Sequence, residues 1–367
     1  MKLLVMSLLS VMIVSIRVNA QGCVAIRTIG GLNTMEHAGM MHNAHKVMDS
    51  SKWTFNIGYR YFNSYKHFNG TDEQTQRVID GTEVRNFNRT FDLSLIRELN
   101  SRWSIGISVP YINNDRSSKY EHVSNLPTSP RYETNAMGIG DIRLTAYRWL
   151  IEPGGKGNLQ AGLGIKLPTG NYQAEDQFHN TLTTTRVGPV DQSIQPGDGG
   201  FGITLELNGF RTLNRNWSLY GNAFYLINPR DNNGVSTTRG GVASASAIKY
   251  TSDVMSVPDQ YLVRGGVNWS VKSFTASIGG RYECIPTFDL IGANTGFRRP
   301  GTVIAIEPGL NYQFKKCTLF AYVPFALFRE RNQSYPDILK TLDTKTFSRG
   351  DAAFADYAVN IGMSFRF

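Results

Sequence analysis

Cysteine, charge and long apolar runs are all scarce in this sequence. Its 367 residues include 3 cysteines, and charged residues make up 18% of the chain, less than the roughly 25% of an average soluble domain. Beyond the N-terminal segment, no apolar run reaches the roughly 18 residues that a transmembrane helix needs. The lack of such runs does not exclude a membrane β-barrel, because each strand of a barrel carries a weaker hydrophobic signal.

The C-terminal segment 353–367 shows the pattern that the sequence has instead. From Tyr357 to Phe367 large apolar residues occupy every second position, with small or polar residues such as Asn360 and Ser364 between them. A strand points alternate side chains to opposite faces, so one face of this segment is apolar and the other polar. In a soluble domain such an edge would promote aggregation. The segment resembles the C-terminal signal of bacterial outer-membrane barrels, in which the last strand pairs with the first.

The same two-residue period begins at Trp53 and predicts twelve strands. Their outward apolar residues lie in the segments 53–61, 91–95, 103–111, 142–146, 159–167, 201–207, 217–225, 263–269, 274–282, 304–312, 319–325 and 357–367. Tight turns and long polar segments alternate between these strands. Long outer loops and short periplasmic turns are typical of outer-membrane proteins. We therefore predict an all-β fold, a transmembrane antiparallel up-and-down β-barrel over residues 52–367.

Two further observations agree with this topology. Trp53, Trp103, Trp217 and Trp269 each fall near a predicted periplasmic strand end, where an aromatic girdle is expected. Two of the three cysteines fall at opposite ends of their strands, Cys284 outside and Cys317 on the periplasmic side. About 25 Å of membrane separates these ends, far beyond the ~7 Å that a disulfide can bridge. We expect no disulfide framework.

The first 20 residues have the composition of a secretory signal peptide. A basic start at Lys2, an apolar core over Leu3–Val14 and small residues ending at Ala20 predict cleavage after Ala20. The alternative is a lipoprotein signal that leads to acylation of Cys23, although the residues before Cys23 fit that pattern poorly.

Residues 21–51 lack the barrel period. Asn33 and Glu36 have the spacing of a capping box and predict a short helix that ends near Met48. This window contains candidate ligands for copper or another metal, at helical spacing: His37, Met41, His42 and His45. The alternative is a polar helix that lies in the periplasm or plugs the lumen.

The polar positions between the outward residues face the predicted lumen. Twelve of them are charged, six cations and six anions: Arg60, Asp92, Glu98, Asp141, Arg143, Lys166, Glu206, Arg264, Arg281, Glu307, Asp356 and Arg366. In one interpretation they pair across strands and satisfy buried charges. In the other, some line a pathway and select solutes by charge and hydrogen bonding. All except Glu98 and Arg366 are taken as the candidate substrate pathway.

Charge and histidine placement bear on partners and on catalysis. The formal charge of +9 falls to +7 without the signal peptide's Lys2 and Arg17, and the basic residues are scattered. Outer-membrane lipid, lipopolysaccharide and anionic solutes are natural partners of such a surface, and no nucleic-acid motif is present.

His67, His122 and His179 fall in predicted outer loops, and no predicted strand carries a histidine. Outer-membrane phospholipases place theirs on a strand, so we predict no enzyme and no cofactor.

Two glycine-rich segments support a family resemblance. Gly138-Ile-Gly-Asp141 opens the fourth strand, and Leu167-Pro-Thr-Gly170 ends the fifth. This part of the chain resembles the outer-membrane transporter family of the MetA pathway of phenol degradation, whose members have GxGD and LPTG elements at such places. The resemblance implies uptake of small, often hydrophobic or aromatic compounds. It carries over no catalytic residue. The Met/His-rich segment before the barrel departs from the family pattern.

The sequence thus predicts an outer-membrane channel of a Gram-negative bacterium for passive or gated uptake of a small solute. Twelve strands lie between the roughly eight of a filled barrel and the 16–18 of an open porin, which favours a narrow bore. The barrel-assembly machinery is expected to recognise the last strand. The alternative is a sealed structural barrel whose long outer loops contact a partner.

Overall fold

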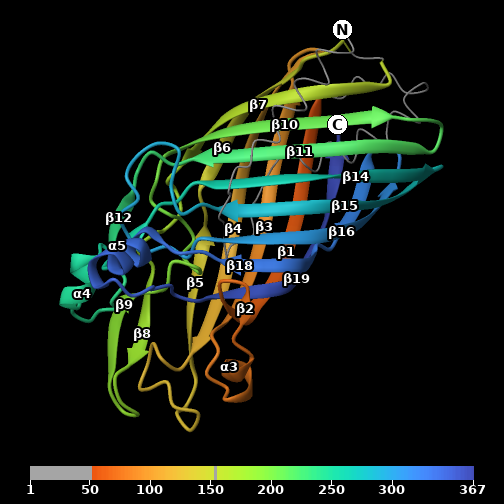
Figure 1. Ribbon diagram of the computed structural model, residues 1–367. Helices are drawn as coiled ribbons and strands as arrows, with labels where there is room; N and C mark the ends of the chain where they lie inside the picture. Colours follow the sequence, from red (N-terminus) through yellow and green to blue (C-terminus); the bar gives the residue numbers. More distant parts are fainter. Residues whose placement is uncertain (1–51, 153–154) are drawn as a thin grey trace.

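A computed structural model describes residues 52–152 and 155–367, which form one closed antiparallel barrel (Figure 1). Two of its strands are interrupted, so β5 with β6 and β17 with β18 each count once. The predicted number of twelve strands is then confirmed: β1 (Trp53–Asn69), β3 (Arg85–Glu98), β4 (Trp103–Ser118), β5 (Tyr132–Ile139) with β6 (Ile142–Trp149), β7 (Gly157–Leu167), β10 (Gly202–Thr212), β11 (Trp217–Ile227), β14 (Gln260–Val271), β15 (Phe274–Ile285), β16 (Gly301–Gln313), β17 (Cys317–Tyr322) with β18 (Phe325–Arg331), and β19 (Ala352–Arg366).

The first and last strands close the barrel. β1 and β19 pair in antiparallel register from Thr54 opposite Arg366 to Phe68 opposite Ala352. Beside this register, the backbone groups of Trp53 and Phe367 exchange two hydrogen bonds of 3.0 Å each. The register shifts between Phe62 and Lys66, where the chain forms bulges. Closure removes the apolar edge that the C-terminal sequence would otherwise expose.

The short elements outside the barrel wall lie in the long connections, at the end away from the C-terminus (Figure 1). They are β2 (Asp72–Glu73), α3 (Thr75–Ile79), β8 (Glu175–His179), β9 (Thr185–Pro189), β12 (Asn232–Ser236), α4 (Ala245–Lys249), β13 (Val254–Ser256) and α5 (Tyr335–Thr344). In the part of the chain that the structure describes, no helix is long and apolar enough to cross a membrane.

Side-chain burial is the reverse of that in a soluble protein. Along β4, Ile105 and Ile107 are 47% and 37% exposed, whereas Ser104 and Ser108 on either side of them are buried. The same alternation of apolar outside and polar inside runs through β10 and β11. An outward apolar band around a polar interior is the arrangement of a transmembrane barrel.

The predicted aromatic girdle and cysteine geometry agree with the structure. Trp53, Trp103 and Trp217 begin their strands, and Trp269 lies opposite Trp217 near the end of β14. No disulfide joins Cys284 and Cys317.

Two strands are interrupted for identifiable reasons. Pro324 separates β17 from β18, since proline cannot donate to the ladder. Gly140 separates β5 from β6, where a Cβ atom would lie 2.9 Å from Ile112 Cδ1 and 3.0 Å from the Pro196 carbonyl. A returning outer loop therefore packs against the barrel wall at Gly140.

Some sequence-based boundaries were wrong. β1 continues to Asn69 and includes His67, and His179 ends β8, so the prediction that no strand carries a histidine fails. β4 and β5 likewise extend into the long polar segment between the predicted strands 103–111 and 142–146, because their outer ends are polar and lack an apolar period. The signal peptide, Cys23 and the segment 21–51 with His37, Met41, His42 and His45 lie outside the described residues and stay predictions.

Candidate solute pathway

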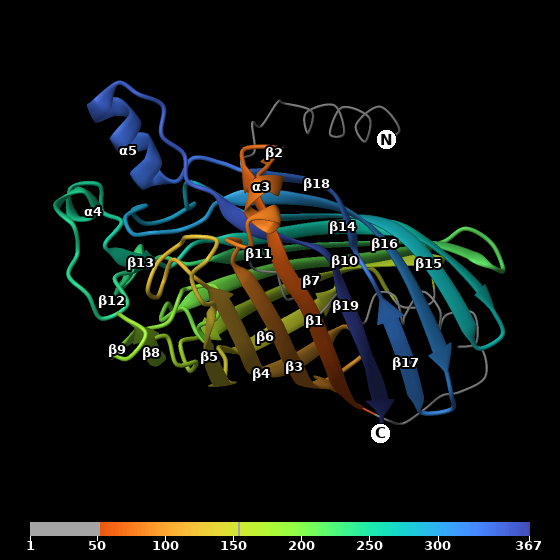
Figure 2. The ribbon, with the colours of Figure 1, turned by 90° about the horizontal axis from the view of Figure 1, so that it is seen from below.

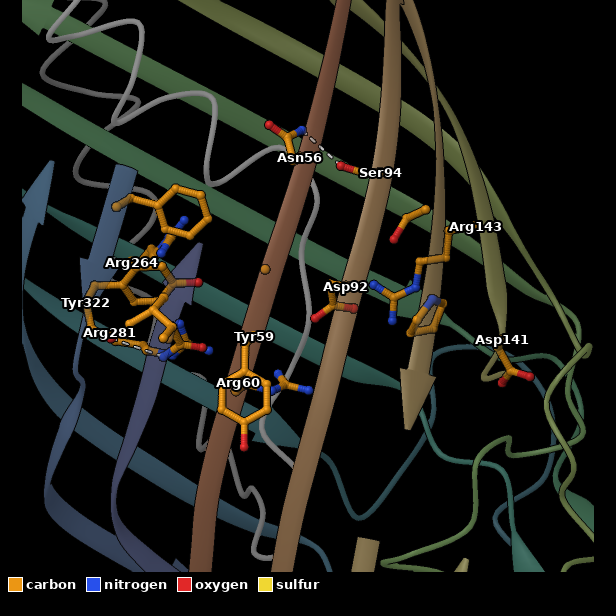
Figure 3. A pocket seen from close by; sticks show the side chains of 16 residues that line it. Asn56, Tyr59, Arg60, Asp92, Ser94, Asp141, Arg143, Arg264, Arg281 and Tyr322 are labelled. Atoms are coloured by element: carbon orange, nitrogen blue, oxygen red, sulfur yellow. Dashed lines mark hydrogen bonds between the residues drawn. The ribbon is translucent and has the colours of Figure 1, made fainter. Parts of the chain in front are cut away.

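A small cavity of about 60 Å³, lined by charged, polar and aromatic side chains, lies inside the barrel (Figure 3). Its polar lining includes Asn56 of β1 and Ser94 of β3, joined by a 2.9 Å hydrogen bond. Six of the ten predicted pathway residues also line it: Arg60, Asp92, Asp141, Arg143, Arg264 and Arg281. Side chains from strands far apart in the sequence thus converge on one space, with four cations and two anions.

A buried carboxylate holds two of these cations in place. Glu307 of β16 is 1% exposed, and its two oxygens accept from Arg264 Nη1 at 3.3 Å and Arg281 Nη1 at 3.1 Å. Arg281 also donates to Glu283 at 2.6 Å. The Arg264 guanidinium lies 5.4 Å from the centre of the Tyr322 ring, a cation–π contact. Two guanidinium groups are therefore fixed beside the cavity with an aromatic ring next to them.

A second ion pair forms where β6 and β7 meet the outer loops. Asp141 and Lys166 form an ion pair, with Oδ2 and Nζ 3.5 Å apart, and Lys166 also contacts Asp198. Asp141 Oδ1 accepts from the backbone N–H of Gly170 at 3.0 Å. This ties both glycine-containing segments that carry the family resemblance to one carboxylate.

The other predicted residues lie beside the cavity or away from it. Glu206 accepts from the Tyr147 hydroxyl at 3.4 Å inside the barrel wall. Asp356 pairs with Lys66 and Arg329 near the bulge in β1, and it does not line the cavity. Glu98 and Arg366, both partly exposed, pair at 2.9 Å.

A second cavity of about 130 Å³ shares Arg60 and Asp141 with the first. Part of its lining comes from the outer loop between β9 and β10, over residues 192–198, and another part from Arg298 and Arg299. The returning loop is anchored by Ile194 and Val190, which are fully buried against Ala136 of β5. The sequence analysis missed these loop residues, because no periodic signal marks a loop that folds back.

Ion pairs join four outer loops above this second cavity. Arg299 donates both Nη groups to Asp191, at 2.8 and 2.6 Å, and Arg116 lies 3.5 Å from the same carboxylate. Arg116 and Arg239 each donate to Glu121 at 2.9 Å. Burial opposes ionisation of Asp191 and Glu121. Even so, Arg116 and its fellow cations hold the pKa of Asp191 well below its usual range and lower that of Glu121 to about 2. The loops are thus locked by charge at neutral pH.

The histidine on the barrel wall, His67 of β1, does not form a hydrolase-like arrangement. His67 Nε2 accepts from the Val84 backbone N–H at 2.9 Å, so Nδ1 carries the proton and donates to Asp351 at 2.5 Å. With Nε2 engaged in this way, His67 is not placed to take a proton from a serine. Among residues 52–152 and 155–367, no group of three or more His, Cys, Asp or Glu side chains could hold a metal ion.

Comparisons with known proteins identify the fold. No protein-family model matches the chain, and no curated protein matches its sequence. The COG4313 outer membrane channel from Pseudomonas putida F1 has a similar structure, with 12% identity, a TM-score of 0.59, and coverage of 88% of this chain and 97% of that one. The β domain of the Bordetella autotransporter Brka gives 12% identity and a TM-score of 0.45, covering 87% of this chain and 100% of that one. The Ralstonia pickettii toluene transporter TbuX gives 10% identity and 0.43, covering 95% and 97%. With the apolar band and the twelve closed strands, the first similarity shows that the chain has the fold of Gram-negative outer-membrane β-barrels.

Proposed function

We propose that the protein is an outer-membrane channel that takes up a small solute, passively or through a gate. The observation that carries this proposal is the convergence of Arg60, Asp92, Arg143, Arg264 and Arg281 on a lumenal cavity. Burying charge is costly, so charged groups held around a space support a role in transport. The similarity in fold to the Pseudomonas putida channel supports the proposal.

The outer loops give this channel a gate. Asp191 holds Arg116 and Arg299 across the top of the second cavity, and Arg299 also lines that cavity. Opening requires these charges to exchange partners, which a charged solute or an applied potential can promote. Six of the ten predicted lumenal residues line the cavity, and Glu307 and Lys166 pair with some of these six.

The solute class follows from the lining and from the family resemblance. Arginines beside Tyr322 and Phe224 suit a small solute with an apolar or aromatic body, in line with the resemblance to the transporters of phenol degradation. The outward face contacts lipid and lipopolysaccharide, and the last strand is read by the barrel-assembly machinery. The proposal includes no cofactor and no catalytic step.

Single-channel recording in a planar bilayer tests this function, with the refolded full chain and with a variant that lacks residues 21–51. Steady conductance of the full chain is expected if the bore is open, and conductance after the deletion alone identifies that segment as a plug. Silence in both would contradict the channel. It would favour a sealed barrel whose locked loops contact a partner, the alternative that the loop ion pairs support.

A further inference from the structure

A third cavity lies among the outer loops and is larger than the two in the lumen. Its volume is about 460 Å³, and its walls come from the outer ends of β1, β4 and β18 and from α3, α4 and α5. Figure 2 shows α4 and α5 together at the loop end of the barrel. Arg299 lines both this outer cavity and the second lumenal cavity. The outer cavity, here called the vestibule, is therefore the space above the gate.

The vestibule contains a buried arginine whose donors are only partly used. Arg331 ends β18 and is 2% exposed. Its backbone is fixed by two hydrogen bonds to Gly70, at 2.8 and 3.0 Å. Its Nη2 donates to Asp337 at 3.2 Å, but its Nε and Nη1 groups have no hydrogen-bond partner within the described ranges. Leaving donors of a buried guanidinium unsatisfied is costly, so an acceptor is expected there.

Asp337, the carboxylate beside Arg331, also accepts hydrogen bonds from other groups. Asp337 Oδ2 also accepts from the backbone N–H and the hydroxyl of Ser334, at 2.9 and 2.8 Å, in the capping box of α5. Its negative charge is thus shared between the helix start and Arg331. Asp337 therefore occupies only one of the Arg331 donor groups, and the other two are left for an external oxyanion.

The charge balance of the vestibule also favours an anion. Its lining has five cationic side chains and two carboxylates: Arg77, Arg116, Arg299, Arg331 and Lys340, with Asp337 and Asp351. Glu121 and Asp191 pair with Arg116 and Arg299 from behind, which still leaves an excess of positive charge.

The remaining walls are suited to an apolar body. Tyr120, Tyr250, Phe297 and Pro336 line the same space. About 460 Å³ is roughly three times the volume of a cavity known to hold benzene, so the space is large enough for a ring with an anionic group.

We propose that the vestibule is a binding site for a small organic oxyanion. Arg331 holds the anionic group, and the apolar body lies against Tyr250 and Phe297. A guanidinium presents its donors in a planar fork that matches a carboxylate or another oxyanion. The proposal rests on the proposed function in one respect: the bound anion is the solute, which next meets Arg299 at the gate.

The test is calorimetric titration of the purified full-length protein with benzoate, benzyl alcohol and inorganic phosphate. Benzoate is expected to bind, and benzyl alcohol, with the same ring but no charge, at least about tenfold more weakly. Phosphate, which lacks the apolar body, is expected to bind more weakly than benzoate. Equal binding of benzoate and benzyl alcohol would overturn the anion site, and phosphate binding as tight as benzoate would overturn the apolar contact.

Variants test whether benzoate binds in the vestibule. Arg331→Gln is expected to weaken benzoate at least about tenfold, and Arg331→Lys, which keeps charge but not the fork, by less. Ser246→Glu adds a negative charge to the vestibule wall and is also expected to weaken benzoate; Glu is well tolerated in the first turn of a helix such as α4. Its matched control is Thr183→Glu, on the exposed β8–β9 turn. Unchanged affinity in both Arg331→Gln and Ser246→Glu would overturn the proposal, and heat-modified gel mobility checks that each variant is folded.

The two proposals fail separately. Conductance without benzoate binding would leave the channel and remove the vestibule site. Benzoate binding without conductance in the full chain or in the variant that lacks residues 21–51 would keep the site and remove the channel.

Discussion

Replacing Glu307 by Gln is the change that best separates the structural from the transport role of the lumenal charges. The substitution keeps the shape of the side chain but removes the negative charge that faces Arg264 and Arg281 at 3.3 and 3.1 Å. Arg281 keeps its pair with Glu283, and Arg264 keeps its contact with the Tyr322 ring. The cavity then has more net positive charge.

The burial of Glu307 sets the expected loss in the free energy of unfolding. Removing one member of a buried ion pair costs about 3–5 kcal/mol, because the partner charge is left uncompensated. Arg264 and Arg281 border the cavity, where water can reach them, so we expect the lower end of that range, about 3 kcal/mol. We also expect the channel to become more selective for anions, since focused charge in a narrow bore sets ion preference.

Two measurements check this prediction. Guanidinium unfolding in detergent, followed by tryptophan fluorescence, gives the free energy of unfolding, and the reversal potential under a KCl gradient gives selectivity. The matched control is Glu98→Gln, whose pair with Arg366 is about one-third exposed and contributes below about 1 kcal/mol. Equal destabilisation by both substitutions, or an unchanged reversal potential in Glu307→Gln, would refute the reasoning.

Three further predictions concern loops, lipid and assembly. Burial lowers the pKa of His122 to about 4, so the folded loops favour its neutral form, and their stability falls as pH drops from about 6.5 towards 4. Glu121, with a pKa of about 2, adds a further loss of stability below about pH 4.5. Hydrogen exchange, corrected for intrinsic rates, should show weaker protection of β8 and β9 near pH 5 than at neutral pH. The same protection at both pH values would contradict this prediction. Leu163→Arg on the lipid face, where Leu163 is 61% exposed, should destabilise the barrel by about 2–4 kcal/mol in bilayer unfolding, whereas Leu163→Phe should be nearly neutral. Phe367→Ser should lower outer-membrane assembly, measured as the heat-modifiable fraction, while secretion is unchanged; normal assembly would argue against recognition of this residue.

The barrel wall was predictable because the membrane imposes a period of two on every strand. That period placed Arg60, Asp92 and Arg264 on the inner face without any contact information, and it placed Asp141 and Lys166, which pair in the structure, on the same face. The same rule fails where the chain bulges, as it does between Phe62 and Lys66 near Asp356. A shift in register there changes which neighbours a side chain meets.

The gate and the vestibule were not predictable, since both depend on where loops fold. Asp191 and Arg299 are 108 residues apart in the sequence, and their pairing requires two loops to meet over the bore. Arg331 follows Phe325 and Leu327 in β18, and its backbone bridges to Gly70, which lies 261 residues earlier in the sequence. Polar loops contain many charged residues, and composition does not say which of them become buried.

The seam between β1 and β19 also has a kinetic consequence. The strand that begins at Trp53 finds its second partner only after the residues up to Phe367 have been added, so nearly the whole described chain must be present before the ladder closes. Contacts of such long sequence separation make folding slow. Until then two strand edges are unpaired and liable to pair with other chains. Barrel closure therefore competes kinetically with aggregation during assembly, and loss of even the last few residues favours aggregation.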